Sequence, residues 1–146
     1  MSRLFRTEQK FGLPPEAVFP FFADVSNLEL ITPPFLRFRV LTPAPVEIRE
    51  GTILDYRLRI HGVPVRWRTL IRAWEPPHRF VDEQIRGPYG RWIHEHRFEA
   101  VADGTRMVDE IDYASPGGRL VERLFVDRDV ERIFAYRARV LAGRLG

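Results

Sequence analysis

The middle of the chain alternates between apolar and polar residues with the period of two that is typical of β-strands. Each alternating segment is rich in β-branched and aromatic residues and ends at Gly, Pro or Asp-Gly. The pattern predicts strands at 35–42, 52–61, 63–74, 79–86, 91–101 and 105–114, and a further alternating stretch predicts a first strand at 3–11. Because short turns join six of these strands in succession, we expect an antiparallel meander.

Apolar residues at helical spacing occupy two other regions. After a Pro-Pro pair that suits the first turn of a helix, the spacing predicts a short helix up to residue 25, kinked at Pro20. A second short helix is expected at 26–31, with Ser26 as its N-cap and a Thr-Pro-Pro stop behind it. The segment 118–146 predicts a long terminal helix.

These elements fit one α+β architecture. A curved, seven-stranded antiparallel sheet, with two short helices after the first strand, would carry the long C-terminal helix across its concave face. The length of 146 residues suits one domain, so we expect residues 1–146 to form a single unit. A strongly curved sheet rarely closes completely on one helix, and we therefore expect a ligand cavity between them.

Composition narrows the class of protein. The chain is 45% hydrophobic and 29% charged, which is typical of a globular domain. No apolar run approaches the roughly 18 residues of a membrane span, and the opening residues lack the apolar core of a signal peptide. The absence of cysteine excludes disulfides, thiolate metal sites and cysteine nucleophiles, and it favours a cytoplasmic location.

The positive charge is spread along the chain. The net charge is +3, almost all the cations are arginine, and acidic residues are interleaved with them. The strongest basic cluster is Arg66, Arg68 and Arg72, which alternate onto one face of a predicted strand. A nucleic-acid surface needs a more concentrated basic face, so we expect these arginines to lie on the solvated outer side of the sheet.

The predicted hairpin 91–114 defines an inward face. Asp103-Gly104 is typical of a two-residue turn, and pairing Ala102 with Thr105 across it would place His96 opposite Ile111. Because side chains alternate, one face is then aromatic and apolar and the other is mostly charged. We expect the first face to point toward the helix and the cavity; its members are Trp92, His94, His96 and Phe98 on one strand and Met107, Asp109, Ile111 and Tyr113 on the other.

Asp109 is then a carboxylate on an inward face, one diagonal step from His96. An isolated buried carboxylate is unfavourable, and a neighbouring imidazolium lowers that cost. Such a pair fits three roles: an internal hydrogen bond that braces the sheet, a contact with a ligand, or proton transfer. The sequence leaves these alternatives open.

The strand 79–86 allows two inward faces. A three-residue turn at 88–90 would place Phe80, Asp82 and Gln84 inward, beside Phe98, His96 and His94. Hydrophobicity alone would instead turn Val81 and Ile85 inward. We prefer the first register because it gives both histidines polar partners. On 63–74 the same alternation points Trp67 inward, so Trp67 and Trp92 are candidates for cavity walls or for simple core packing.

Other chemistries have less support. His-x-His on a strand places both imidazoles on one face, and Asp82 or Asp109 could complete a two-His-one-carboxylate metal set. The motif is short, however, and the other two histidines, His61 and His78, lie in or near predicted turns, so we expect no metal. The chain has no Gly-x-Ser-x-Gly motif and no Gly-rich phosphate loop, which argues against nucleophilic hydrolysis and phosphate binding.

Several short motifs follow one another along the chain. They are Asn27-Leu28, Ile31-Thr32-Pro33-Pro34, Phe80-Val81-Asp82-Glu83-Gln84, Gly87-Pro88-Tyr89, the set Trp92, His94, His96 and Phe98, then Met107-Val108-Asp109-Glu110 and Ile133-Phe134-Ala135-Tyr136-Arg137. With the element order, they resemble the START-like (SRPBCC, helix-grip) superfamily over the whole chain, and within it a bacterial polyketide cyclase/dehydrase-like subgroup. The resemblance implies the helix-grip fold. It does not imply one activity, because the superfamily includes both ligand carriers and enzymes.

We therefore expect a protein that binds a small hydrophobic molecule between the sheet and the C-terminal helix, without a cofactor, a nucleic-acid partner or integral membrane association. The candidate ligand-binding residues are Trp67, Phe80, Asp82, Gln84, Trp92, His94, His96, Phe98, Asp109, Ile111, Tyr113 and Phe134, with Phe125 and Ile133 as further candidates. The entrance is expected near 31–35, Pro45 and 87–90. The alternatives are a cyclase/dehydratase-type enzyme that uses His/Asp acid–base chemistry in the same cavity, and a partner-interaction module without a specific ligand.

Overall fold

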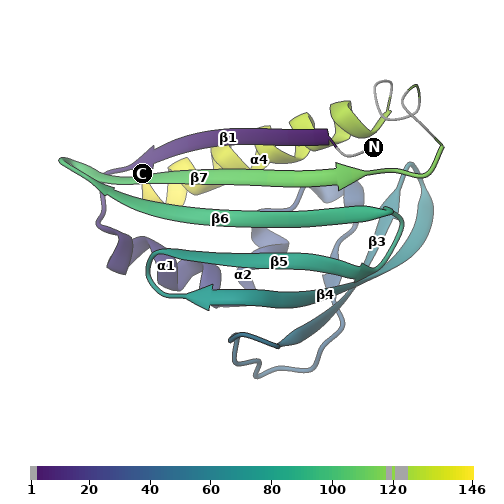
Figure 1. Ribbon diagram of the computed structural model, residues 1–146, viewed down its shortest axis with the longest axis horizontal. Helices are drawn as coiled ribbons and strands as arrows, with labels where there is room; N and C mark the ends of the chain where they lie inside the picture. The colour runs from purple at the N-terminus through teal and green to yellow at the C-terminus, as the bar shows by residue number, and fades with distance from the viewer. Residues whose placement is uncertain (1–2, 118–119, 121–124) are drawn as a thin grey trace.

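The computed structural model describes residues 3–117, 120 and 125–146, and it consists of a curved sheet with helices along one side (Figure 1). The elements in chain order are β1 (Arg3–Phe11), α1 (Pro15–Ala23), α2 (Asn27–Leu30), the 3-10 helix η1 (Pro34–Leu36), β2 (Arg39–Val40), β3 (Ile53–Ile60), β4 (Val63–Glu75), β5 (Arg79–Arg86), β6 (Arg91–Val101), β7 (Gly104–Ala114) and α4 (Asp127–Leu145). No helix among the described residues is long and apolar enough to cross a membrane.

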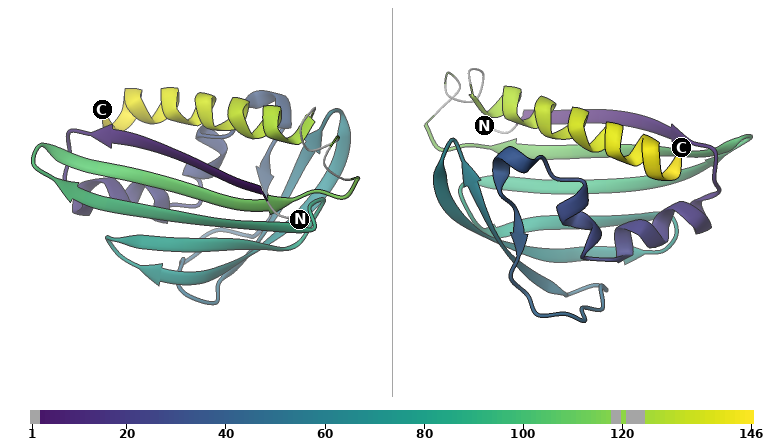
Figure 2. Two further views of the ribbon diagram at one scale, coloured as in Figure 1. Left: turned by 45° about the horizontal axis from the view of Figure 1, so that its top comes forward. Right: turned by 180° about the vertical axis from the view of Figure 1, so that it is seen from behind.

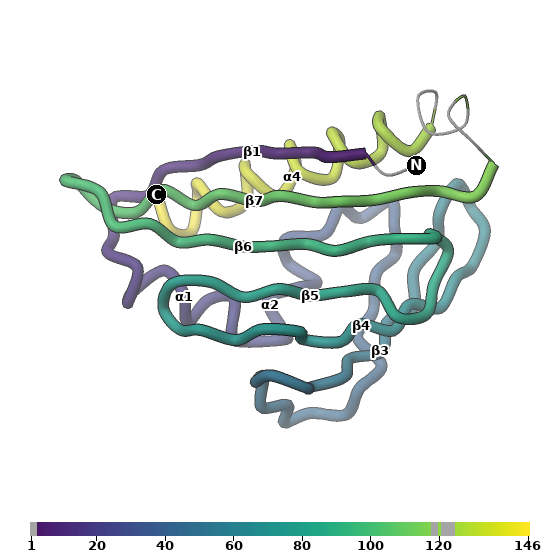
Figure 3. Tube along the Cα trace, in the orientation of Figure 1, coloured from purple at the N-terminus to yellow at the C-terminus, as the bar shows by residue number. Residues whose placement is uncertain are grey.

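The strands form one antiparallel, seven-stranded sheet in the order β1-β7-β6-β5-β4-β3-β2. The tube in Figure 3 shows the chain leaving the edge strand β1 and passing through α1 and α2 to the opposite edge. Figure 2 shows α1, α2 and α4 on the same face of the sheet, which curves around them. The predicted α+β fold, with the C-terminal helix across the concave face, is confirmed.

The predicted strand at 35–42 is wrong in extent. The 3-10 helix η1 takes its first residues, and Arg37 then has a left-handed φ of 47°. Only Arg39–Val40 pairs with β3. Pro43 and Pro45 lack a backbone N–H and cannot continue a ladder, so the chain leaves the sheet as a loop that returns at β3.

The first helix is shorter than predicted. α1 begins at Pro15 and ends at Ala23, and it buries Val18, Phe19 and Phe22 against the sheet. The side chain of Ser26 does not cap α2, because its hydroxyl lies 2.6 Å from a carboxylate oxygen of Asp24 and donates to it instead. The apolar stripe of α1 therefore closes one end of the concave face.

The β6–β7 hairpin turns one residue earlier than predicted. Val101 pairs with Gly104, so residues 102–103 form the turn. Gly104 has a φ of +146°, and a Cβ there would clash with the backbone oxygen of Phe11, so the glycine serves the close approach to β1. The ladder is shifted by two residues, which keeps every side chain on its predicted face and brings His96 directly opposite Asp109.

The neighbouring strands keep the preferred inward face. β5 is also shifted by two residues, so that Phe80 lies opposite His96 and Asp82 opposite His94. In β4 an irregularity between Ile71 and Ala73 leaves Arg72 without a ladder partner. The extra residue turns Trp74 inward, where its ring centroid lies 5.3 Å from that of Phe80.

The arginines on β4 lie on the outer side of the sheet, as predicted. The Nε of Arg68 donates to a carboxylate oxygen of Asp55 at 2.8 Å on the adjacent strand, and the Nε of Arg72 lies 3.5 Å from Glu83. These cross-strand pairs leave no concentrated block of unpaired cations on this strand.

The helix α4 presents one stripe to the sheet, made of Val130, Phe134, Arg137 and Leu141. This spacing of three and four residues is the one predicted from the sequence. The predicted helical residues 118–119 and 121–124 lie outside the described part of the chain. Leu141 is completely buried in a cluster with Phe11, Val18 and other core residues.

Replacing Leu141 with alanine should lower the free energy of unfolding by about 2–5 kcal/mol, because the cavity that it leaves cannot fully collapse. Urea titration of the variant measures this loss. Leu4→Ala is the matched control, since Leu4 is 69% exposed and its truncation should change stability by less than about 0.5 kcal/mol. Equal effects in the two variants would contradict the placement of α4 over the core.

Candidate functional site

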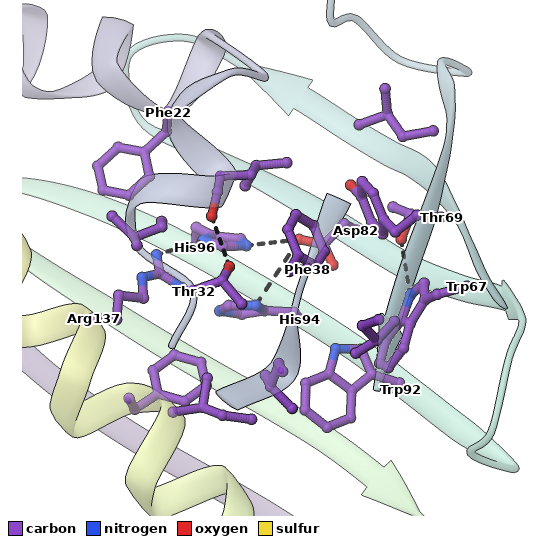
Figure 4. A pocket seen from close by; sticks show the side chains of 18 of the residues that line it. Phe22, Thr32, Phe38, Trp67, Thr69, Asp82, Trp92, His94, His96 and Arg137 are labelled. Atoms are coloured by element: carbon purple, nitrogen blue, oxygen red, sulfur yellow. Dashed lines mark hydrogen bonds and ion pairs between the residues drawn. The ribbon is translucent and has the colours of Figure 1, made fainter. Parts of the chain in front are cut away.

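A cavity of about 200 Å³ lies between the concave face of the sheet, α4 and the segment that joins α2 to β2. Of the predicted ligand-binding residues, those that line it are Trp67, Phe80, Asp82, Trp92, His94, His96 and Phe134. Figure 4 shows the two histidines and Asp82 pointing toward one another at one end, and the two tryptophans lying at the other. The cavity is therefore apolar along most of its wall, and its largest group of polar side chains lies at the end with the histidines.

Three predicted residues lie deeper than expected, and the prediction that they line the cavity is wrong. Phe98 is 2% exposed and packs against Phe19 and Phe22. Ile111 and Tyr113 are buried in a cluster beneath α4, where the hydroxyl of Tyr113 donates to Asp127. All three point inward, but the helices cover them, because an inward side chain reaches a cavity only where no helix packs over it.

Gln84 of β5 was predicted to face His94 in the cavity, and it does not line the cavity. Its amide nitrogen donates to the backbone oxygen of Tyr89 at 2.7 Å, and its amide oxygen accepts from the Tyr89 N–H at 3.1 Å. The β5–β6 ladder stops at Glu83, earlier than a three-residue turn would allow, so Gln84 closes the loop instead of facing His94. A Cβ at Gly87 would clash with the Gln84 amide, so the glycine makes room for this closure.

The polar end of the cavity is built on two stacked imidazoles. The rings of His94 and His96 have centroids 3.5 Å apart, and Phe80 stacks on His96 at 3.9 Å. On the cavity side, Nε2 of His96 lies 2.7 Å from an oxygen of Asp82. On the sheet side, Nε2 of His94 lies 2.8 Å and Nδ1 of His96 lies 3.2 Å from the same oxygen of Asp109. The two histidines thus bridge two carboxylates.

Asp109 does not line the cavity, contrary to prediction. It is 1% exposed, behind the histidines, and its role in contact with a ligand would be indirect. Asp82 is the carboxylate that reaches the cavity, with 21% of its side chain exposed.

Arg137 completes the cluster from α4 and was not among the predicted site residues. Its Nη2 lies 3.4 Å from both Nδ1 of His96 and an oxygen of Asp109, and its side chain is 9% exposed. The sequence does carry a signal for it. Arg137 occupies a position on the stripe of Phe134 and Leu141, so an arginine on an otherwise apolar stripe marks a buried polar partner.

These partners decide the protonation of the cluster. Burial alone would raise the pKa of Asp109, but the charge of Arg137 and the hydrogen bonds from both histidines hold that pKa well below its usual range. Asp82 is held ionised in the same way, since the contacts with His96 and His94 outweigh its burial and lower its pKa. Burial, together with the neighbouring His96, lowers the pKa of His94 to about 4, against the effect of Asp109. At neutral pH both carboxylates are charged and His94 is neutral.

A second polar contact lies where the β3–β4 turn meets α4. His61 has a φ of 49° in that turn, and its Nε2 lies 2.9 Å from an oxygen of Asp129. Asp129 is 8% exposed and lines the cavity. Phe125, which was expected to enclose the ligand, is instead 51% exposed and packs edge-on against His61.

Each expected part of the entrance contributes to the lining. Ile31 and Thr32 come from the first segment, Ile48 from the loop near Pro45, and Tyr89 from the β5–β6 loop. The lining also includes Thr69, which the alternation turns inward beside Trp67, and Tyr56, which the sequence did not single out. The Thr69 hydroxyl accepts from the indole N–H of Trp67 at 3.0 Å, and burial raises the pKa of Tyr56, which stays a neutral phenol.

Residues 11–135 match the family described as "Polyketide cyclase / dehydrase and lipid transport". The chain belongs to this family. The match spans most of the sequence and agrees with the predicted superfamily. A search of curated proteins finds no match.

Solved structures show the same fold. The Zhui aromatase/cyclase from Streptomyces sp. R1128 is 18% identical, with a TM-score of 0.75, over 99% of this chain and 94% of that one. Protein Ms6760 from Mycobacterium smegmatis is 20% identical, with a TM-score of 0.72, over 97% and 90%. Major latex-like protein 151 from Panax ginseng is 10% identical, with a TM-score of 0.72, over 99% and 98%. Family and fold are consistent with hydrophobic-ligand binding or a polyketide cyclase-type role.

Replacing Asp109 with asparagine should lower the free energy of unfolding by about 3 kcal/mol at pH 7, because it leaves the buried charge of Arg137 without its partner. A carboxylate with a lowered folded-state pKa stabilises the protein above its unfolded pKa, and this stabilisation is lost as the pH falls. The difference between wild type and variant should therefore shrink below about pH 4.

Urea titrations at pH 7 and at about pH 3, below the unfolded pKa of an aspartate, measure this difference. Asp103→Asn is the matched control, because Asp103 lies in the exposed hairpin turn and should matter little at either pH. A loss below about 1 kcal/mol for the Asp109 variant would contradict the role of Asp109 in joining sheet and helix.

Proposed function

We propose that this protein binds a small, largely apolar molecule in the cavity between the sheet and α4. The observation that supports this most strongly is the composition of the cavity wall, which is mainly apolar and aromatic and carries partnered polar groups at a few places, chiefly the cluster of Asp82, His94, His96 and Arg137. Such a site takes up a hydrophobic body and orients it through a few polar contacts.

The volume of the cavity limits the size of the ligand. A closed cavity of about 150 Å³ accommodates benzene, so about 200 Å³ suits a body of one or two fused rings or a chain of similar volume. Trp67, Trp92 and Phe134 offer flat aromatic surfaces to this body. The proposed ligand is therefore compact.

The polar end of the ligand would meet Asp82, His94, His96 and Arg137. The charged Asp82 accepts a hydrogen bond, whereas the guanidinium of Arg137 and a ring N–H of His96 donate. A hydroxyl group, which both donates and accepts, matches this mixture, and a carbonyl or carboxylate would use the donors alone. Asp109 supports these groups from behind and would affect the ligand only through the histidines.

A cyclase/dehydratase-type reaction in the same cavity is the second candidate. It is favoured by the contact between His96 and the cavity-facing Asp82, which could move a proton to or from a bound oxygen or carbon. Product analysis after incubation with short poly-β-keto thioesters would detect turnover. Loss of product in Asp82→Asn, with ligand binding retained, would support catalysis.

Binding is tested with 2-naphthol and naphthalene, which have the same apolar body and differ by one hydroxyl. Both should quench the tryptophan fluorescence of the native protein, because Trp67 and Trp92 line the cavity. In His96→Gln the affinity for 2-naphthol should fall about tenfold or more, the effect of losing one hydrogen bond within a charged network. The affinity for naphthalene should change less than about twofold.

His78→Gln is the control variant, since His78 lies in the β4–β5 turn outside the cavity. It should leave both affinities unchanged, and both variants should melt within a few degrees of wild type. Equal weakening of the two compounds in His96→Gln would show that His96 only shapes the cavity. If neither compound binds the native protein, and native mass spectrometry detects no co-purified molecule, a partner-interaction module becomes the better hypothesis.

A further inference from the structure

We propose that Asp82, His94 and His96 form a binding site for one divalent transition-metal ion, of the zinc or ferrous type, at the polar end of the cavity. This inference goes beyond the proposed ligand binding and does not depend on it. It differs from the expectation drawn from the sequence, where the short His-x-His motif alone did not justify a metal.

The three side chains converge from two adjacent strands. One ligand atom from each of Asp82, His94 and His96 lies within 4.8 Å of the others. An oxygen of Asp82 is 2.7 Å from Nε2 of His96 and 3.9 Å from Nδ1 of His94. Bonds of about 2.1 Å to a metal place ligand atoms about 3 Å or slightly more apart, so side-chain adjustments of about 1 Å would complete the set. Two histidines and one carboxylate are a common donor set for these ions.

Asp109 lies behind the two histidines, where a carboxylate can accept hydrogen bonds from metal-ligating imidazoles and so orient them. The same Asp109 oxygen lies 2.8 Å from Nε2 of His94 and 3.2 Å from Nδ1 of His96. If both of these nitrogens donate to Asp109, Arg137 donates to Asp109 and not to His96, and the lone pairs of His94 Nδ1 and His96 Nε2 lie on the side of Asp82. A carboxylate behind each ligating imidazole fixes the tautomer in this way in many metal sites.

The charges of the cluster also favour a cation. The cluster holds the carboxylates of Asp82 and Asp109, and within the described residues Arg137, which contacts Asp109, is the one permanent cation at the cluster. Two carboxylates thus face one guanidinium, and a further positive charge at this buried place, on an imidazole or as a metal ion, would be favourable. The short contact between Asp82 and His96 also needs a proton or a metal ion between oxygen and nitrogen, because two lone pairs would repel.

The three proposed metal ligands leave one side of the metal site unoccupied by protein groups, and this side faces the cavity. The Asp82 side chain is 21% exposed there, while both histidines are 7% exposed or less. Three protein ligands leave coordination positions for water or for an oxygen of a bound molecule. A divalent ion would add positive charge to the cluster, so the site would favour an anionic oxygen.

The test uses the full chain after removal of metals with a chelator. Calorimetric titration with Zn²⁺ should give one ion per chain, and Co²⁺ should produce visible absorption bands of a nitrogen- and oxygen-coordinated ion. His94→Gln, His96→Gln and Asp82→Asn should each weaken Zn²⁺ binding at least about 100-fold, and Asp109→Asn should weaken it about 10- to 100-fold. His61→Gln and His78→Gln are matched controls and should bind Zn²⁺ as wild type does.

A measurement on the unmodified protein guards against variants that fail to fold. In nitrogen-detected NMR of the imidazoles, Zn²⁺ should shift Nδ1 of His94 and Nε2 of His96 and leave their other nitrogens protonated. Less than about 0.2 ions bound per chain, or binding that is lost in His61→Gln or His78→Gln but kept in the cluster variants, would overturn the proposal.

Ligand binding is measured separately, with 2-naphthol and metal-free protein. If 2-naphthol binds while Zn²⁺ does not, the metal proposal fails and the proposed function stands. If Zn²⁺ binds at the cluster while neither 2-naphthol nor naphthalene binds the cavity, the proposed function fails and the metal site stands.

Discussion

The burial of one carboxylate, Asp109, constrains the whole concave face. A charged group that is 1% exposed is tolerated only when its partners are in place, and these come from two different elements. His94 and His96 approach from β6, and Arg137 approaches from the middle of α4. The cluster therefore ties the C-terminal helix to the centre of the sheet at one defined point, in addition to the apolar contacts on either side of it.

This arrangement divides the concave face by function. Phe98, Ile111 and Tyr113 are covered by helices and stabilise the fold, whereas Trp67, Trp92 and the cavity side of the histidines stay open. Asp109 and Asp82 share the same two imidazoles, but only Asp82 reaches the cavity. A loss of stability and a loss of binding can therefore be separated by choosing which carboxylate is changed.

Much of the fold could be predicted because the relevant signals are local. Period-two alternation predicted six of the seven strands and the inward face of β6 and β7, whereas the inward face of β5 was chosen because it gives both histidines polar partners. Both hairpin registers were wrong by two residues, yet the faces were right, because a shift by an even number preserves alternation. The predicted strand at 35–42 was shortened because a 3-10 helix and the left-handed backbone of Arg37 occupy its first residues.

The sequence by itself determined that His94 and His96 face inward, because their strand alternates between an apolar and a charged face. For Asp82 it allowed two faces, and the need of the histidines for polar partners favoured the inward one. Only the tertiary structure decided how deep each one lies. Gln84 hydrogen-bonds to the β5–β6 loop, and Asp109 is covered by the histidines. Arg137 contacts His96 from α4, although the two residues are 41 positions apart in the sequence. Such contacts depend on the curvature of the sheet and on the position of α4 across it, and these arise only when segments distant in sequence pack together.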